Sequence, residues 1–248
     1  MTTPSATPPS ARAGTKGVPR AERERQILAA ATQEFGRTGY EGSSLAAVAA
    51  RVGVTKTLLH QYFGTKQDLY LACLVPAGDR ILSAIRAAMQ ATPTADTAVK
   101  ETAVGGPAER ERAGERRADA PEPAAGSAAP IARSTPLRVM HGVFTALEGR
   151  REAWFVLYDT SLPAESEAAR RARHYRAAID DCAAVGTADV LLSAESFDSL
   201  DADALSHAWR GMATALIRWW INHPDESADA MTERCARLFT AARDVLGP

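Results

Sequence analysis

Cysteine is scarce in this sequence of 248 residues, and its placement argues against two kinds of site. Cys73, Cys182 and Cys235 are far apart, odd in number and form no CxxC pair. A disulfide framework normally uses an even set of cysteines, and a thiolate zinc site needs paired ones. We therefore expect neither a disulfide framework nor a metal site, and we expect the protein to reside in the reducing cytoplasm.

Long hydrophobic runs are missing as well. No apolar stretch reaches the roughly 18 residues that a membrane-spanning helix needs. Residues 1–18 also lack the apolar segment of a secretory signal, although Arg12 and Lys16 are basic. The sequence therefore predicts a protein that neither crosses a membrane nor is exported.

The common catalytic motifs are absent. The sequence contains no GxSxG, no HExxH, no P-loop and no Rossmann glycine pattern. Its five histidines never stand four residues apart, so no helix can present a pair of them to one metal ion. We therefore predict that the protein is not an enzyme and that it needs no cofactor.

The residues that are abundant favour helices. Hydrophobic residues make up 46% of the chain and charged residues 24%, which is ordinary for a chain that buries a core. Alanine, leucine, arginine and glutamate are frequent, and these are strong helix formers. Alternation of β-branched and polar residues is nearly absent. The sequence predicts an all-α protein of one or two domains.

Charge is distributed unevenly along the chain, although the net charge is only -1. Through Lys66 there are nine Lys or Arg against four Asp or Glu, and the remainder has 20 against 26. A basic end favours contact with phosphates, and an acidic body keeps the rest of a protein off a duplex. The alternative is chance variation in an arginine-rich composition.

Two short helices joined by a tight turn are predicted in residues 43–66, SSLAAVAARVGVTKTLLHQYFGTK. Apolar residues recur at three- and four-residue spacing in the first half, after Ser43 or Ser44 as the N-cap. Gly53 stands where a left-handed C-cap residue is needed, and Thr55 can cap the second helix. This is the pattern of a helix-turn-helix.

The second helix carries a polar outer face. Leu59 and Phe63 share its buried side, whereas Lys, Thr, His and Gln on the outward face suit hydrogen bonding to base edges and phosphates in a major groove. Lys66 can contact a phosphate beside the amides that begin the next helix. The alternative is a solvated face on a small helical bundle. The residues expected to bind double-stranded DNA are Ser44, Thr55, Lys56, Thr57, His60, Gln61, Tyr62 and Lys66.

Roughly residues 20–70 resemble the N-terminal domain of the tetracycline-repressor (TetR) family. The resemblance is carried by ILAAATQEFGRTGYEGSSLAAVAARVGV followed by TKTLLHQYFGTKQDLY, in that family's order and spacing. It implies a three-helix DNA-binding domain and a C-terminal helical domain that binds an effector and dimerises. Thr57 and His60 depart from the family, which commonly has a small residue and a phosphate-contacting tyrosine in this helix.

The composition divides the chain into three parts. Residues 1–18 are predicted to be a disordered arm, 19–66 the DNA-binding domain, and 67–248 the effector-binding and dimerisation domain. Within the last part, about 91–134 is rich in Ala, Pro, Gly, Glu and Arg. We predict a disordered loop there, with an isolated solvated helix as the alternative.

Helix boundaries follow from glycine and proline. A first helix begins near Pro19 and is expected to end at Gly36 and Gly39. A fourth begins near Lys66 and is expected to kink or break at Pro76, which is either a hinge or an irregularity.

Later helices are predicted from Pro136 to Gly149, from Pro163 to about Leu192, and as a final pair separated by a turn at Pro224. Aromatic residues with a polar tip suit an apolar cavity, although each can also be plain core. The effector pocket is predicted to include Phe144, Trp154, Tyr158 and Trp209. The final pair resembles the family's four-helix dimer interface, and the alternative is packing on its own domain. The predicted interface residues are Leu205, Met212, Leu216, Trp219, Met231, Cys235, Leu238 and Val245.

The sequence therefore predicts a homodimeric transcriptional regulator, a repressor, that binds a palindromic operator and is released by an unidentified small molecule. Two alternatives are an effector-independent or architectural DNA-binding protein and a helical enzyme. A closed C-terminal core, without a cavity of a few hundred cubic ångströms, would favour the effector-independent protein.

Overall fold

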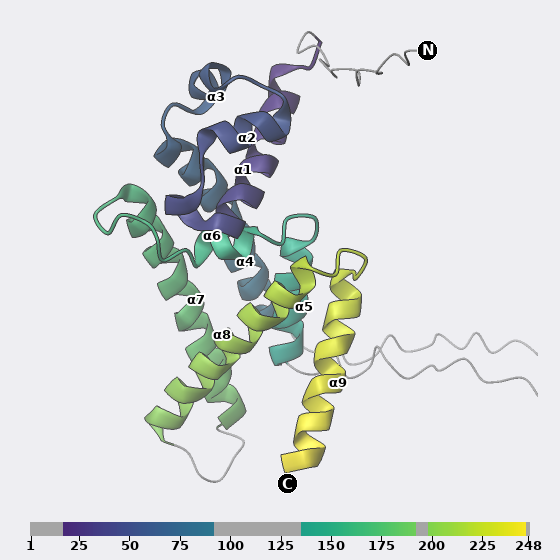
Figure 1. The fold of residues 1–248 in the computed structure, drawn as a ribbon. Coiled ribbons are helices and arrows are strands. Elements are labelled where there is room, and N and C mark those ends of the chain that lie inside the picture. The colour runs from purple at the N-terminus through teal and green to yellow at the C-terminus, as the bar shows by residue number, and fades with distance from the viewer. Residues whose placement is uncertain (1–16, 92–134, 192–197, 247–248) are drawn as a thin grey trace, which may run out of the picture.

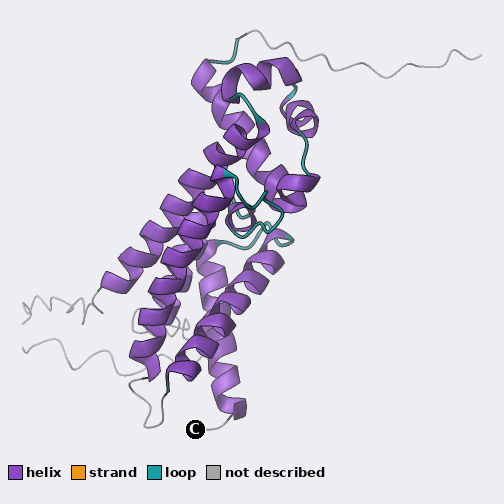
Figure 2. Ribbon diagram, turned by 90° about the vertical axis from the view of Figure 1, so that its left-hand side faces the viewer, coloured by secondary structure: helices purple, strands orange, loops and turns teal. Residues whose placement is uncertain are grey.

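The computed structural model describes residues 17–91, 135–191 and 198–246, without the side chains of 187–191 and 242–246. These ranges form nine helices and no strand, which confirms the predicted all-α class (Figures 1 and 2). The predicted arm and the predicted loop at about 91–134 lie almost wholly outside the described residues. The helices are α1 (Arg20–Gly42), α2 (Leu45–Val52), α3 (Lys56–Phe63), α4 (Lys66–Gln90), α5 (Thr135–Leu147), α6 (Ala153–Leu157), α7 (Glu167–Leu191), α8 (Ser199–Ile221) and α9 (Ala228–Leu246).

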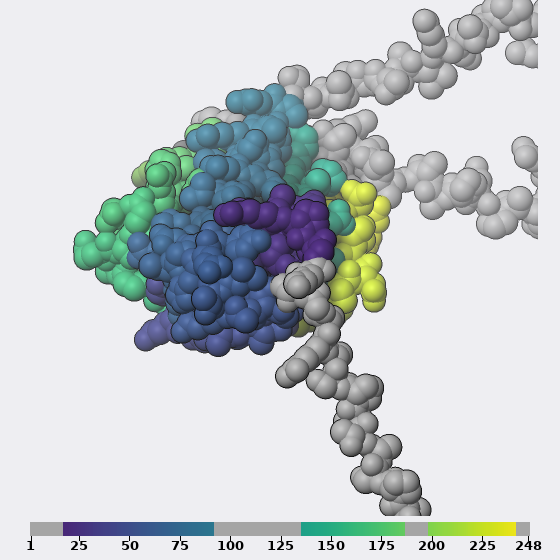
Figure 3. Space-filling view, turned by 90° about the horizontal axis from the view of Figure 1, so that it is seen from above, coloured from purple at the N-terminus to yellow at the C-terminus, as the bar shows by residue number. Residues whose placement is uncertain are grey.

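Helices α1 to α3 form a unit at one end of the molecule. Its core contains Ile27 and Phe35 from α1, Val48 from α2 and Leu59 from α3, all fully or almost fully buried. Tyr40 lies beneath this unit, because its ring contacts Phe35 and lies 5.3 Å, edge on, from the ring of Tyr70 in α4. Seen from that end, the unit occupies the centre of the molecular surface (Figure 3).

Gly36 and Gly39 of α1 have different roles. Gly39 interrupts the helix, because its φ of 72° lies in the left-handed region. Gly36 does not end the helix, contrary to the prediction. A Cβ at Gly36 would lie 2.4 Å from the carbonyl oxygen of Glu152, so this glycine permits a close approach between α1 and the start of α6.

Helix α4 connects the N-terminal unit to the rest of the chain. It continues through Pro76 without the predicted break. Pro76 is exposed, whereas Leu74 and Ala77 beside it are buried, so core packing holds the helix on both sides of the proline. The hinge interpretation of Pro76 stays a prediction.

The C-terminal body is built on α4. Helices α5 and α7 pack against it, α9 packs on α5, and α8 packs on α7 (Figure 1). Apolar side chains along one face of α5, among them Leu137, Met140 and Leu147, are buried. Helix α7 begins at Glu167 instead of Pro163, because the Ser166 hydroxyl accepts the amide of Ala169 at 3.1 Å and caps the helix there. No described helix is long and apolar enough to span a membrane.

Helices α8 and α9 diverge from their connecting turn (Figure 1). Ala213, Ile217 and Trp220 of α8 enter the core, and Met231 and Cys235 of α9 are buried as well. In one copy of the chain α8 therefore packs chiefly on α7 and α9 chiefly on α5, while α8 and α9 contact each other through Trp209 and Phe239, whose ring centres lie 5.4 Å apart.

Candidate nucleic-acid interface and ligand cavity

The turn between α2 and α3 has the caps that the sequence predicts. The Ser44 hydroxyl accepts the amide of Ala47 at 3.0 Å, and the Thr55 hydroxyl accepts the amide of Leu58 at 3.1 Å. Gly53 adopts the left-handed conformation at the end of α2. Ser44 is therefore the N-cap of α2, because the Ser43 hydroxyl donates to the Tyr40 carbonyl instead.

Helix α3 presents a polar face to solvent. Lys56, Thr57, His60 and Gln61 are exposed on it, and Leu59 is buried beneath them. Short polar side chains and amides on a protruding helix can bond to base edges in a major groove. The geometry of α2 and α3 is therefore suited to placing α3 in that groove.

His60 and Tyr62 are held by contacts within the domain. His60 Nδ1 lies 2.6 Å from the Gly64 carbonyl oxygen and donates to it, which leaves Nε2 for another partner. Tyr62 is only partly exposed, and the Arg20 guanidinium lies 5.2 Å from its ring centre. Tyr62 thus anchors the first turn of α1 beside α3.

Lys66 bonds to the protein's own backbone. Its Nζ donates to the carbonyl of Ser43 at 2.7 Å and lies 4.7 Å from the ring centre of Tyr40. The ammonium thereby ties the start of α4 to the turn between α1 and α2. Its predicted contact with a phosphate stays a prediction, and it competes with these intramolecular contacts.

A carboxylate already occupies the start of α4. Asp68 accepts the amide of Thr65 at 2.9 Å and its hydroxyl at 2.7 Å, and the Asp68 amide donates back to that hydroxyl at 3.2 Å. The hydrogen bonds from Thr65 lower the pKa of Asp68 below its usual value. A phosphate at this helix end would meet a negative charge, which the sequence alone did not indicate.

Several basic residues of the N-terminal unit are paired internally. Arg37 bonds to Glu152 at 3.2 Å, and Arg51 to Glu34 at 3.3 Å. Lys56 forms no such pair with another described residue. The excess of positive charge near the interface is therefore smaller than the count of basic residues suggests.

An apolar cavity of about 150 Å³ lies among α4, α5, α6, α7 and α8. Aliphatic, thioether and indole groups form most of its wall. Three of the four predicted pocket residues, Trp154, Tyr158 and Trp209, line it. Cys182 of α7 lies in the same wall.

Phe144 does not line the cavity. It is fully buried, and its ring lies 5.5 Å, edge on, from that of Trp220. The predicted pocket residue Phe144 therefore lies in the core beside Trp220 and outside the wall of this cavity, because helical spacing identifies a buried face but not which buried residues border a void.

Helix α6 joins the cavity to the N-terminal unit. Trp154 and Tyr158 line the cavity, and the adjacent Asp159 accepts the Tyr40 amide at 2.6 Å and the Tyr70 hydroxyl at 3.1 Å. On the other flank, Glu152 bonds to Arg37. Sequence reasoning missed these contacts, because they join residues more than 80 positions apart and no local pattern indicates them.

Arg151 fastens the turn between α8 and α9. Its guanidinium donates to the carbonyls of Trp220 at 2.8 Å, His223 at 3.0 Å, Pro224 at 3.0 Å and Glu226 at 2.7 Å. It also lies 4.1 Å from the Trp220 ring centre. Arg151 and Glu152 together therefore connect the last two helices to the N-terminal unit.

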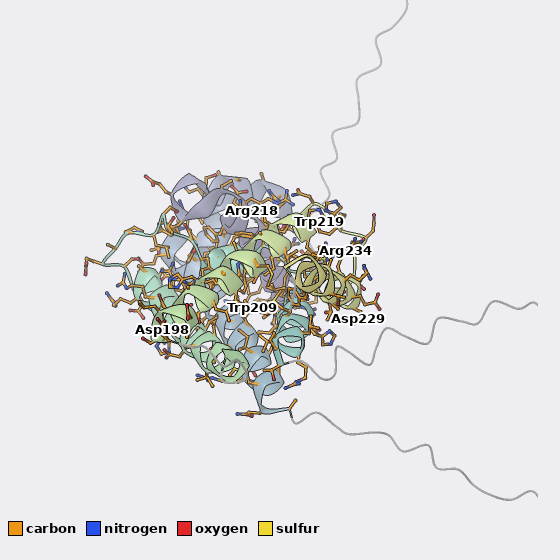
Figure 4. All side chains as sticks on the ribbon, turned by 90° about the horizontal axis from the view of Figure 1, so that it is seen from below. Asp198, Trp209, Arg218, Trp219, Asp229 and Arg234 are labelled. Carbon is orange, nitrogen blue, oxygen red and sulfur yellow. The ribbon has the colours of Figure 1, made fainter. Side chains whose placement is uncertain are left out.

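The outer face of α8 and α9 retains only part of the predicted interface. Trp219 is 37% exposed and Leu238 51% exposed. His223 stacks on Trp219, with ring centres 3.6 Å apart, and the Arg234 guanidinium lies 5.1 Å from the Trp219 ring centre. Figure 4 shows Trp219 and Arg234 close together on α8 and α9. Met212 and Leu216 are partly exposed, and Leu205 lines the cavity.

Two predicted interface residues lie elsewhere. Met231 and Cys235 are both 0% exposed and belong to the core of a single copy of the chain, so their place in a subunit interface stays a prediction that the packing of one copy does not support. Their spacing marks the apolar face of α9, and α5 covers that face. The side chain of Val245 lies outside the described residues.

Comparison with known proteins identifies a family model and a curated relative that are similar in sequence. Residues 27–73 match the family model of bacterial regulatory proteins of the tetR family. The HTH-type transcriptional activator FasR of Mycolicibacterium smegmatis is 40% identical over 75 residues, which are 30% of this chain and 34% of FasR. The matched region thus spans about a third of the length of this curated relative.

Solved structures share the fold over most of the chain. The ketosteroid transcriptional regulator KstR2 of Mycobacterium tuberculosis has a TM-score of 0.58 at 14% identity, covering 89% of this chain and 92% of KstR2. PfmR of Thermus thermophilus has a TM-score of 0.54 at 16% identity, covering 87% and 93%. A TetR-like regulator of Rhodococcus sp. RHA1 has a TM-score of 0.52 at 21% identity, covering 92% and 100%. All three are described as regulators and none as an enzyme.

Proposed function

We propose that this chain is a regulator of transcription of the TetR family, to which its N-terminal domain and its fold are similar. It acts in the cytoplasm as a homodimer that binds a palindromic operator. A small effector releases it from that operator. The observation that carries the proposal is the exposed polar face of α3, held outward by the capped turn that follows α2.

Thr57 and Gln61 are the side chains we propose to read bases. Both are exposed on the outer face of α3. Removing a base contact costs about 1 to 3 kcal/mol and relaxes specificity at that position. The experiment is a binding titration of the Thr57→Ala, Gln61→Ala double variant against a selected operator and single-base variants of it. Thr240→Ala, an exposed threonine on α9, is the control.

The expected result is that the double variant binds the operator and its variants with nearly equal affinity, while Thr240→Ala discriminates as the wild type does. Undiminished discrimination in the double variant would show that another face reads the bases. Binding to no duplex by the wild type, after selection from a random library, would overturn the proposed function.

The dimer is supported by the exposed apolar groups of α8 and α9. Trp219 and Leu238 project outward from these two helices, where burial against a second copy would remove them from water. A palindromic operator requires two recognition helices about one helical turn of DNA apart, which two-fold symmetry supplies.

Effector release is supported by the cavity and its connection to the N-terminal unit. A ligand in the cavity touches α6, whose flanks bond to α1 and α4 through Glu152 and Asp159. A ligand shifts the equilibrium only if it binds one arrangement more tightly than the other. The cavity is smaller than the usual range of a few hundred cubic ångströms for ligand pockets. Its small volume is the observation that favours the alternative, a DNA-binding protein without an effector.

Repression is the proposed sign of regulation, and activation is the second candidate because the relative FasR is described as an activator. The test measures transcription from the natural promoter with and without the protein. Increased transcription on deletion of the gene supports repression, and decreased transcription supports activation.

A further inference from the structure

Most polar groups in the cavity wall already have partners among the described residues. The Trp154 indole donates to the Thr214 hydroxyl at 3.1 Å. The Thr135 hydroxyl accepts from Arg138 at 2.9 Å. These groups orient the wall, and a ligand would have to break an existing bond to use them.

The charged groups in the described wall are also paired. Asp180 of α7 and Arg210 of α8 form a hydrogen-bonded ion pair at the edge of the cavity. An anion would compete with Asp180 for Arg210, and a cation would compete with Arg210 for Asp180. Either ligand charge would leave one partner of a partly buried pair unmatched. The described wall therefore disfavours ligands of both signs.

Tyr158 differs from the hydrogen-bonded and ion-paired residues of the wall. Its ring stacks on Trp154 at 4.7 Å, and its hydroxyl oxygen is buried without a hydrogen-bond partner in the described structure. Burial, with the nearby Asp180 carboxylate, raises the pKa of Tyr158 to about 12. The phenol therefore keeps its proton at neutral pH and can donate it to an acceptor.

The volume limits the size of the ligand. An engineered apolar cavity of about 150 Å³ in another protein holds one benzene molecule. The cavity here has about the same volume, with aliphatic and indole walls that suit an apolar body. Every basic side chain in the described wall is already ion-paired, so a ligand carboxylate or phosphate would find no unpaired positive charge to bind.

We propose that the effector is a small uncharged molecule with an apolar body about the size of one aromatic ring, and with one oxygen acceptor that receives a hydrogen bond from Tyr158. This inference rests on the proposed function, because it treats the cavity as the effector site. The matching group is a ketone, ester or ether oxygen, which accepts a hydrogen bond without bringing a charge.

The experiment compares four probes of nearly the same shape with the full chain at neutral pH. Acetophenone carries a neutral acceptor, α-methylstyrene replaces its oxygen by a CH₂ group, benzoate is an anion and benzamidinium is a cation. Binding is measured by ligand-observed NMR titration. Acetophenone is expected to bind about fivefold more tightly than α-methylstyrene, as one neutral hydrogen bond allows. Both ions are expected to bind more weakly than either neutral probe.

Two variants locate the contact. Tyr158→Phe is expected to weaken acetophenone about fivefold and to leave α-methylstyrene unchanged. Val139→Phe, at a partly buried position in the wall, is expected to fill the cavity and abolish binding of both neutral probes. Thermal melting of each variant verifies that it is folded.

Tighter binding of either ion, equal weakening of both neutral probes by Tyr158→Phe, or undiminished binding to Val139→Phe would each overturn this inference. Lack of binding by the neutral probes to the wild type would do the same. None of these outcomes bears on DNA recognition, because the operator titration with the α3 variants tests that separately.

Discussion

Lys66 illustrates how one side chain can have a structural role at a position where the sequence suggests a DNA contact. Its ammonium bonds to the Ser43 carbonyl and lies over the Tyr40 ring. We expect Lys66→Met to lower the free energy of unfolding by about 1 kcal/mol, because the partly buried Ser43 carbonyl loses its donor. The salt dependence of operator binding separates the two roles of Lys66: it stays unchanged if the ammonium bonds only to the protein, and its slope falls by about 0.9 if the ammonium also contacts a phosphate.

Lys56→Met is the matched control, since Lys56 is exposed on α3 without an ion-pair partner among the described residues. It should leave the melting temperature unchanged and lower the slope of log affinity against log salt by about 0.9. Melting curves and binding at several salt concentrations measure both effects. A lowered slope in Lys66→Met at unchanged stability would show that Lys66 contacts a phosphate and that its bond to Ser43 contributes little to stability.

Asp68 makes the stability of the fourth helix depend on pH. Its pKa is lower in the folded protein than the usual 3.8, so its stabilising contribution is fully present above that value. The contribution is lost as the pH falls through the lower, folded value. We expect Asp68→Asn to melt at a lower temperature than the wild type at neutral pH, and the difference to disappear in acid. A difference that stayed constant down to about pH 3 would contradict this account.

The contact between α1 and α6 depends on a missing side chain. A Cβ at Gly36 would lie 2.4 Å from the Glu152 carbonyl oxygen, whereas one at Gly42 would meet only the Thr38 Cβ at 3.6 Å. We expect Gly36→Ala to destabilise the protein by about 1 to 3 kcal/mol through overpacking. Gly42→Ala should be neutral or stabilising by up to about 1 kcal/mol. Urea unfolding of both variants provides the comparison, and equal stabilities would show that α6 moves away at little cost.

Local signals in the sequence predicted the caps but not the contacts between distant elements. Ser44, Gly53 and Thr55 were predictable because a cap is specified by residues a few positions apart. The close approach of Gly36 to Glu152 was not, since it joins segments more than 100 residues apart. For the same reason the sequence, which predicted Tyr158 as a pocket residue, could not show that the adjacent Asp159 bonds to α1.

At the scale of the whole molecule, the sequence could not show whether an apolar residue of the last two helices lies in the core of one chain or in an interface between two chains. Helical spacing placed Met231, Cys235 and Leu238 on one face of α9, yet the first two are fully buried and Leu238 is half exposed. An apolar stripe indicates that something covers it, and only the packing of α5 shows how much of it is covered within one chain.

The proposed dimer can be tested with the exposed part of that stripe. We expect Leu238→Glu to shift the protein from dimer to monomer, because it places a charge where a second copy would exclude water. Operator affinity should fall with it, since two half-sites are no longer bound together. Sedimentation equilibrium measures the mass. Val185→Glu, at a 57% exposed position on α7, is the control expected to remain dimeric. If the Leu238→Glu variant stayed dimeric, the subunit interface would have to lie on another surface of the protein.

The three thiols provide a natural reporter for the cavity. Cys73 and Cys235 are buried, and burial raises their pKa values to about 12 and about 11, so both resist alkylation at neutral pH. Cys182 is partly exposed and borders the cavity. Iodoacetamide should therefore label the wild-type chain at one position, without removal of any cysteine. A molecule that fills the cavity should slow that labelling, so a mass-spectrometric time course can screen candidate effectors before any operator sequence is known.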